Sequence, residues 1–160
     1  MPRCIRRSSV GLVWVLFAAV AAPVHAHEPV PVVKSLEHVT LFVRSYDEAL
    51  AWYVGKLGLV KVDDQPMGGG QRWLTVAPSR DSATKLVLAV PSNALASSIG
   101  QQHNWVYRVG DCHEAHALLS GRGVRFLQEP RQAPWGCQAI IEDLYGNRLV
   151  LLSNGPQRKP

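Results

Sequence analysis

The hydrophobic and polar residues of this chain alternate in short runs that predict β-strands. In EHVTLFV, residues 37–43, every second residue is valine or leucine, and a histidine, a threonine and a phenylalanine lie between them. This period of two is typical of a strand with one buried face. Runs of aliphatic residues bounded by turn-forming residues predict further strands at 59–62, 72–76, 85–90, 124–128, 137–142 and 148–153.

Two helix starts interrupt these strands. Ser45 is followed three residues later by Glu48, and Asp111 stands in the same relation to Glu114. In such a capping box the first side chain accepts a bond from a free backbone amide, and the acid reaches back to the start of the helix. Apolar residues follow each start at helical spacing, and each predicted helix ends at a glycine-containing turn.

The order of these elements repeats along the chain. When Ser45 is aligned with Asp111, Glu48 coincides with Glu114, and the Leu-Val-Leu triplets of KLVLAV and RLVLLS coincide after a slightly smaller shift. We therefore predict an α+β fold of two tandem βαβββ modules, residues 36–92 and 102–153, in which a curled mixed sheet surrounds a concave pocket. The helices are expected to cover the strand face that carries Val39, Leu41, Val43, Trp105, Tyr107 and Val109.

The segment 1–26 has the pattern of a secretory signal peptide. Three arginines precede an apolar run from Val10 to Ala22, and small or aliphatic residues surround Ala26. This run is shorter than the roughly 20 residues of a membrane-spanning helix, so we expect cleavage near Ala26, a periplasmic or secreted protein, and no stable membrane anchor. Cleavage would remove three arginines and no acid, so the net charge would fall from +5 to +2, which argues against a nucleic-acid partner. A lead-in at 27–35 and a tail at 154–160 would flank the domain.

Two cysteines remain in the mature chain. Cys112 and Cys137 would lie in a compartment that permits disulfides, and the spacing is compatible with a bond or with two small core residues. His113 and His116 are one helical turn apart, but two ligands do not make a structural zinc site, which normally needs four. We interpret these histidines as solvated helix residues.

The repeated module resembles the vicinal-oxygen-chelate superfamily, which includes glyoxalase I, extradiol dioxygenases and bleomycin-resistance proteins. The resemblance covers residues 36–153 and is carried by the opening EHVTLFV and by three segments, GGGQRWLTVAP (68–78), PWGCQAIIED (134–143) and LYGNRLVLL (144–152). It implies a pocket for a small-molecule ligand. Because members of this fold commonly pair, it also implies a homodimer.

The resemblance further implies one metal ligand from the first and one from the last strand of each module. The four positions are His38, Val87, Asn104 and Val150. Valine has no ligand atom and an asparagine oxygen is a poor donor for a first-row metal, whereas glyoxalase chemistry needs a metal and a carboxylate that moves a proton. We therefore predict a small-molecule-binding protein without a tightly bound metal or other cofactor. A metal-dependent lyase or dioxygenase with a depleted ligand set is the alternative, and a non-catalytic interaction module is a third possibility.

The family pattern also nominates site residues on the concave face. His38 and Glu142 are the predicted catalytic pair if the protein is an enzyme, although an ion pair of Glu142 with a nearby arginine is the preferred interpretation of this residue. The predicted substrate-binding residues are Phe42, Trp73, Asn104, Arg108, Trp135 and Gln138.

Overall fold

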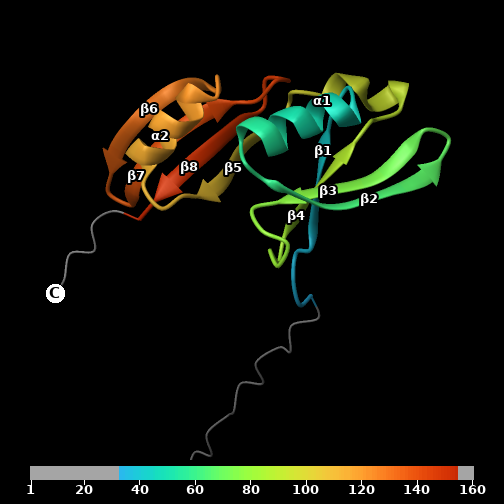
Figure 1. Cartoon of the computed structure of the whole chain (residues 1–160), viewed down its shortest axis with the longest axis horizontal. Helices are drawn as coiled ribbons and strands as arrows, with labels where there is room; N and C mark the ends of the chain where they lie inside the picture. Colours follow the sequence, from blue (N-terminus) through green and yellow to red (C-terminus); the bar gives the residue numbers. More distant parts are fainter. Residues whose placement is uncertain (1–32, 155–160) are drawn as a thin grey trace, which may run out of the picture. The chain divides into compact units, whose positions relative to one another are not determined.

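A computed structural model of the chain describes residues 33–154. The predicted signal peptide, its cleavage site and most of the predicted tail lie outside the described residues. The two βαβββ modules are confirmed, and in each of them a helix lies against one face of a four-stranded sheet (Figure 1). In the part of the chain that the structure describes, no helix is long and apolar enough to cross a bilayer.

Module 1 and module 2 contain the same elements in the same order. Module 1 consists of β1 (His38–Phe42), α1 (Tyr46–Leu50), a π-helical continuation (Ala51–Lys56), β2 (Val60–Gly68), β3 (Gln71–Ala77) and β4 (Lys85–Ala89). A 3₁₀ helix (Asn93–Ser98) leads to module 2, which consists of β5 (His103–Arg108), α2 (Cys112–Gly121), β6 (Arg125–Ala133), β7 (Gly136–Glu142) and β8 (Arg148–Ser153).

The two sheets have equivalent topology. Their strand orders are β1-β4-β3-β2 and β5-β8-β7-β6, so the first strand of each module is an edge strand parallel to the fourth. Thr40 pairs with Val87 in module 1, and Val106 pairs with Val150 in module 2. His38 is two residues before Thr40, and Asn104 is two residues before Val106. The strand pairing therefore agrees with the predicted correspondence of His38 with Asn104 and of Val87 with Val150.

The core lies between the sheets and their helices. Leu41 and Val43 from the first strand region are fully buried with Ala49 and Tyr53 from the helical segment of module 1. Val39, Trp105, Tyr107 and Val109 are only partly buried and pack against this cluster. Leu41 and Val43 of the strand face predicted to meet the helices are therefore buried in the core, whereas Val39, Trp105 and Tyr107 of the same face also line a pocket.

The two helix starts differ in how they are capped. Asp111 accepts bonds from the amides of His113 at 2.7 Å and Glu114 at 3.0 Å, which confirms the predicted N-cap. These two backbone bonds lower the pKa of the Asp111 carboxyl. Ser45 occupies the cap position of α1, but its side chain makes no capping bond, so the prediction of a capping box there is wrong. Glu48 instead accepts from the Tyr145 hydroxyl of module 2 at 3.4 Å, which draws it away from the start of its helix.

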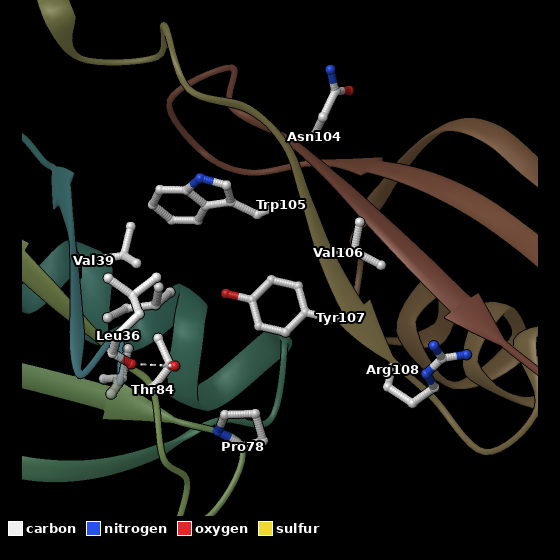
Figure 2. Close-up of a pocket in the computed structure, with 11 residues that line it drawn as sticks. Leu36, Val39, Pro78, Thr84, Asn104, Trp105, Val106, Tyr107 and Arg108 are labelled. Atoms are coloured by element: carbon white, nitrogen blue, oxygen red, sulfur yellow. Dashed lines mark hydrogen bonds between the residues drawn. The ribbon is translucent and has the colours of Figure 1, made fainter. Parts of the chain in front are cut away.

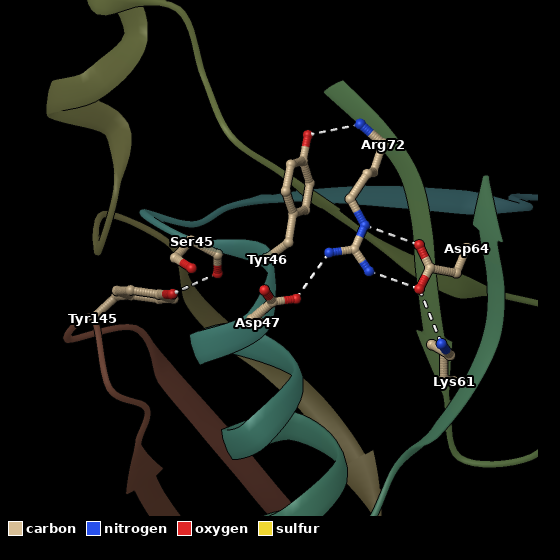
Figure 3. Close-up of polar contacts among 7 residues, drawn as sticks. All are labelled: Ser45, Tyr46, Asp47, Lys61, Asp64, Arg72 and Tyr145. Carbon is tan, nitrogen blue, oxygen red and sulfur yellow. Dashed lines mark hydrogen bonds and ion pairs between the residues drawn. The ribbon is translucent and has the colours of Figure 1, made fainter. Parts of the chain in front are cut away.

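Arg72 ties the β2–β3 hairpin to α1 (Figure 3). Its guanidinium donates to both carboxylate oxygens of Asp64, at 2.9 and 2.6 Å, and to Asp47 on α1 at 2.9 Å. The same group lies 5.2 Å from the centre of the Tyr46 ring. The bonds from Arg72 and Lys61 lower the pKa of Asp64 to about 2. The hairpin is thereby held against the helix of its own module by a two-point contact of the kind only arginine can make.

A buried carboxylate joins the two modules. Asp143, at the end of β7, accepts a bond of 2.5 Å from the hydroxyl of Tyr53 in module 1. It also accepts from the amides of Tyr145 and Asn147, both at 2.8 Å, and from the side-chain amide of Asn147 at 2.7 Å. Burial, followed by the Asp143 charge, raises the pKa of Tyr53, so its hydroxyl stays protonated and donates.

The same turn reaches the segment that precedes β5. The Oδ1 atom of Asn147 accepts from the amide of Gln102 at 3.0 Å. Gly100 has φ of +78°, and a Cβ at that position would lie 2.2 Å from the carbonyl oxygen of Tyr145, so only glycine fits there. The position of β5 beside module 1 is therefore set by contacts with the β7–β8 turn.

We expect Tyr53→Phe to reduce the free energy of unfolding by about 1–3 kcal/mol, because it removes one donor from a buried carboxylate. Tyr107→Phe is the matched control: this hydroxyl is buried without a hydrogen-bond partner among residues 33–154, so its removal should leave stability unchanged or slightly higher. Urea unfolding of both variants measures the difference. Equal losses in the two variants would contradict the role assigned to Asp143.

Candidate functional site

A pocket of about 600 Å³ lies where module 1 meets β5 (Figure 2). We call it the seam pocket. Its walls are apolar and aromatic, and its rim carries polar and charged side chains. The walls are formed by Leu36, Val39, Val76, Leu86, Trp105 and Tyr107. A cavity of this size and character is typical of sites that bind drug-sized molecules.

Strand alternation in β5 shapes one side of the pocket. Trp105 and Tyr107 point toward module 1, whereas Val106 and Arg108 point to the other side of the strand (Figure 2). A bulge between His103 and Trp105 interrupts the pairing with β8, and Asn104 adopts φ of +68° at this point. The bulge adds one residue to the edge strand and sets the direction of the two aromatic rings that follow.

The Tyr107 hydroxyl is the distinctive polar group of the seam pocket. It is buried and has no hydrogen-bond partner within the described part of the chain, and it points toward Leu36 and Val39 (Figure 2). Burial raises the pKa of Tyr107, so the group is a neutral donor and acceptor. Leaving such a group unpaired costs about 1–3 kcal/mol, and a ligand that bonds to it would recover this energy.

Two contacts shape the rim. The Thr84 hydroxyl donates to the carbonyl oxygen of Leu36 at 2.7 Å and fixes the lead-in to β1 (Figure 2). Arg108 donates to the side-chain oxygen of Asn154 at 2.5 Å. This partner is neutral, and Arg108 forms no ion pair within residues 33–154.

The predicted site residues fall into separate groups. The rings of His38 and Trp73 lie 5.2 Å apart on the concave face of module 1, and Phe42 lies on the same face of β1 by alternation. Asn104 and Arg108 lie at the rim of the seam pocket. No hydrogen bond or ring contact within residues 33–154 connects the two groups.

The remaining predicted residues lie on or beside β7. The Trp135 indole donates to the side-chain oxygen of Gln138 at 2.9 Å. Glu142 forms an ion pair with Arg125 on the neighbouring strand β6. Glu142 thus has the arginine partner that the sequence analysis gave as one alternative. A catalytic role of Glu142 with His38 stays a prediction.

The donor set at the family metal positions does not fit a metal. Val87 is buried and pairs with Thr40, and Val150 pairs with Val106, so two of the four positions carry only carbon. In the described residues, the one group of three metal-ligating side chains is elsewhere, at Cys112, His113 and Cys137. We therefore derive no reaction step through a metal at His38.

The sequence interpretation did not identify Trp105 and Tyr107 as site residues. It assigned both to the helix-packing face, and they do pack against the core, but they also wall the seam pocket. A signal was present: in the alignment that places Ser45 on Asp111, these aromatic residues stand where module 1 has Val39 and Leu41. Larger side chains at equivalent edge-strand positions indicate that the two edges do not have the same neighbours.

The profile of the Glyoxalase/Bleomycin resistance protein/Dioxygenase superfamily matches residues 35–151, and the chain belongs to this superfamily. It is 31% identical over 121 residues to YurT, an uncharacterized protein of Bacillus subtilis strain 168, covering 71% of this chain and 94% of YurT.

Two solved structures from Streptomyces sp. CB03234 are similar to the chain. One is TnmS3, described as an antibiotic binding protein, with 30% identity, a TM-score of 0.69, and coverage of 78% of this chain and 99% of TnmS3. The other is a glyoxalase/bleomycin resistance protein with 32% identity, a TM-score of 0.63, and coverage of 74% and 99%.

The metal positions can be tested by restoring them. Val87→Glu, Asn104→His and Val150→Glu together should lower stability by at least about 1 kcal/mol, because two carboxylates enter apolar settings. Zinc at about 100 times its Kd should then return about 2.7 kcal/mol, since it binds only the folded form. Thermal melts with the disulfide intact measure both effects.

The matched control carries glutamine in place of both glutamates, with Asn104→His retained, and should gain less from zinc. The wild-type protein should gain nothing from micromolar zinc. A wild type that zinc stabilises, and a His38→Gln variant that zinc does not, would contradict the metal-free interpretation.

Proposed function

We propose that this protein is an exported small-molecule-binding protein that holds an apolar, aromatic ligand in the seam pocket without a tightly bound metal. The observation that carries the proposal is the apolar, aromatic pocket of about 600 Å³, which is lined in part by Tyr107, a residue whose buried hydroxyl has no partner in residues 33–154. The similarity to TnmS3, described as an antibiotic binding protein, supports the binding of a small molecule.

The proposed mode of binding follows from the walls. Trp105 and Tyr107 line one side of the pocket, and aliphatic side chains from module 1 line the other. A planar ring system between them would bury both of its faces. One acceptor or donor on the ligand would bond to Tyr107, and an anionic substituent would lie near Arg108.

The alternative function, a metal-dependent lyase or dioxygenase with a depleted ligand set, has weaker support. It needs ligands at positions occupied by Val87 and Val150. Glu142, the carboxylate that would move a proton, is paired with Arg125. Binding explains the observed residues with fewer assumptions.

Ligand binding is tested with a panel of planar aromatic compounds, including aromatic antibiotics, screened by thermal shift. A ligand at about 100 times its Kd should stabilise the protein by about 2.7 kcal/mol. Tyr107→Phe should weaken that ligand about 3- to 10-fold through the lost hydrogen bond. Calorimetric titration measures the affinities.

A blocking variant separates the seam pocket from other surfaces. Leu36→Trp should fill the pocket from its exposed rim and abolish binding, whereas Leu118→Trp, the same change at an exposed position of α2 that does not line the pocket, should bind normally. Equal affinity in the two variants would overturn the proposed site.

The proposed assembly is a homodimer in which a second copy covers the concave faces. These faces carry large apolar side chains in water: Trp73 is 36% exposed and Val106 is 59% exposed, and Trp135, beside β7, is 65% exposed. Covering them would remove apolar surface from water. Light scattering at micromolar concentration should give twice the chain mass, and a monomer mass would reject the assembly.

Export is the remaining part of the proposal. It is supported by the arginines and the apolar run of residues 1–26 and by the pairing of Cys112 with Cys137, which persists in oxidising compartments. N-terminal sequencing of the periplasmic protein should begin at His27. Retention of the whole leader would contradict export by cleavage.

A further inference from the structure

The start of α2 and the start of β7 bring three metal-ligating side chains together. Cys112 is the first residue of α2 and Cys137 is the second residue of β7, and their sulfur atoms form a disulfide with a Cα–Cα distance of 6.1 Å. The Nε2 atom of His113 lies 4.0 Å from the sulfur of Cys137. All three ligand atoms lie within 4.8 Å of one another.

His113 and His116 do not form the pair that their sequence spacing allows. His116 packs its ring against Phe126, with the ring centres 4.5 Å apart. His113 is exposed and turns toward the disulfide. The histidine that joins the group is therefore selected by the fold, and His116 provides a natural comparison on the same helix.

We propose that, once the disulfide is reduced, Cys112, Cys137 and His113 bind one zinc ion. The reduction is carried out by a dithiol reductant, which gives two electrons and two protons to the cysteine sulfurs and becomes a disulfide itself. Zinc then displaces the two thiol protons, and the neutral imidazole of His113 donates its lone pair without losing a proton. Two thiolates balance the charge of the ion.

The geometry of the three atoms suits this site. With Zn–S distances near 2.3 Å and Zn–N near 2.0 Å, tetrahedral ligand atoms lie roughly 3.5–3.8 Å apart. The observed separation of 4.0 Å between His113 and Cys137 is close to this value. Zinc binding would mainly require the two sulfur atoms, which are bonded in the disulfide, to move apart to the spacing of tetrahedral zinc ligands. Side-chain rotation can supply this movement, because Cα atoms 6.1 Å apart accommodate both a disulfide and a shared metal.

The surroundings favour a thiolate site with one open position. Cys112 lies at the N-terminus of a ten-residue helix, where the helix dipole stabilises a thiolate. Both cysteines are buried, whereas His113 is exposed, so one side of the group faces solvent. Two cysteines and one histidine with a solvent ligand match the composition of open zinc sites, and thiolates select zinc over calcium or magnesium.

The disulfide makes this site conditional. In the oxidised protein both sulfurs are consumed by their bond and only His113 can donate. In the reduced protein all three donors are free, so zinc affinity depends on the redox state of the chain. The site is separate from the seam pocket, because none of its three residues lines that pocket, and it does not depend on the proposed ligand.

The test uses the full mature protein, reduced with a non-thiol phosphine and kept anaerobic. Co²⁺ serves as the spectroscopic probe because sulfur-to-cobalt charge transfer reports thiolate ligands, and Zn²⁺ affinity is then measured by displacement of Co²⁺. We expect one equivalent of Co²⁺ to bind with thiolate bands in the reduced protein and none in the oxidised protein.

Variants on α2 separate this site from adventitious binding. His113→Gln should weaken zinc at least about tenfold, since even residues behind the ligands contribute that much. His116→Gln should bind as the wild type does. Far-UV circular dichroism, recorded with and without zinc, shows whether the reduced chain keeps or regains its fold.

Three results would overturn the site. They are equal Co²⁺ binding by oxidised and reduced protein, unchanged affinity in His113→Gln, and a reduced chain that neither keeps its fold nor regains it with zinc.

Discussion

The architecture depends on the buried carboxylate of Asp143. A buried ionised carboxylate is costly unless donors surround it, and here two backbone amides, one side-chain amide and the Tyr53 hydroxyl all donate to it. Three of these bonds fold the β7–β8 turn around the carboxylate, and the fourth comes from module 1. The requirement to satisfy one buried charge therefore holds the two modules of the chain together.

The seam pocket is a consequence of this constraint. Asn147, itself held by Asp143, bonds to the backbone just before β5, and Gly100 allows that segment to approach the turn closely. β5 is thereby positioned as an edge strand whose aromatic residues face module 1. The pocket is walled by apolar groups from both modules, and one of its lining residues, Tyr107, has a buried hydroxyl without a hydrogen-bond partner in residues 33–154.

Much of the fold could be predicted from the sequence because strand alternation and helix periodicity are local properties. The repeat that aligns Ser45 with Asp111 identified the two modules, and the Asp111 cap forms as its sequence spacing indicates. The Ser45 side chain makes no capping bond, and Glu48 accepts instead from Tyr145, a residue 97 positions away. Local patterns fail where a distant residue competes for the same group.

The candidate site was harder to predict for the same reason. Trp105 and Tyr107 were assigned correctly to a packing face, but which surface they meet depends on how the modules join. For Cys112 and Cys137 the sequence allowed two interpretations, a disulfide or two separate core residues. Spacing in sequence does not fix the distance between two Cα atoms. The rings of His38 on β1 and Trp73 on β3 lie close together, and their role as site residues stays a prediction.

The most direct test of the account is the position of a bound aromatic ligand. Anilinonaphthalene sulfonate, which is aromatic and anionic, is a suitable probe, and nuclear Overhauser effects between it and the protein would locate it. The account predicts contacts from the probe to the rings of Trp105 and Tyr107 and to the methyl groups of Val39 and Leu86. Contacts to His38 and Trp73 on the concave face, with none to Tyr107, would contradict it.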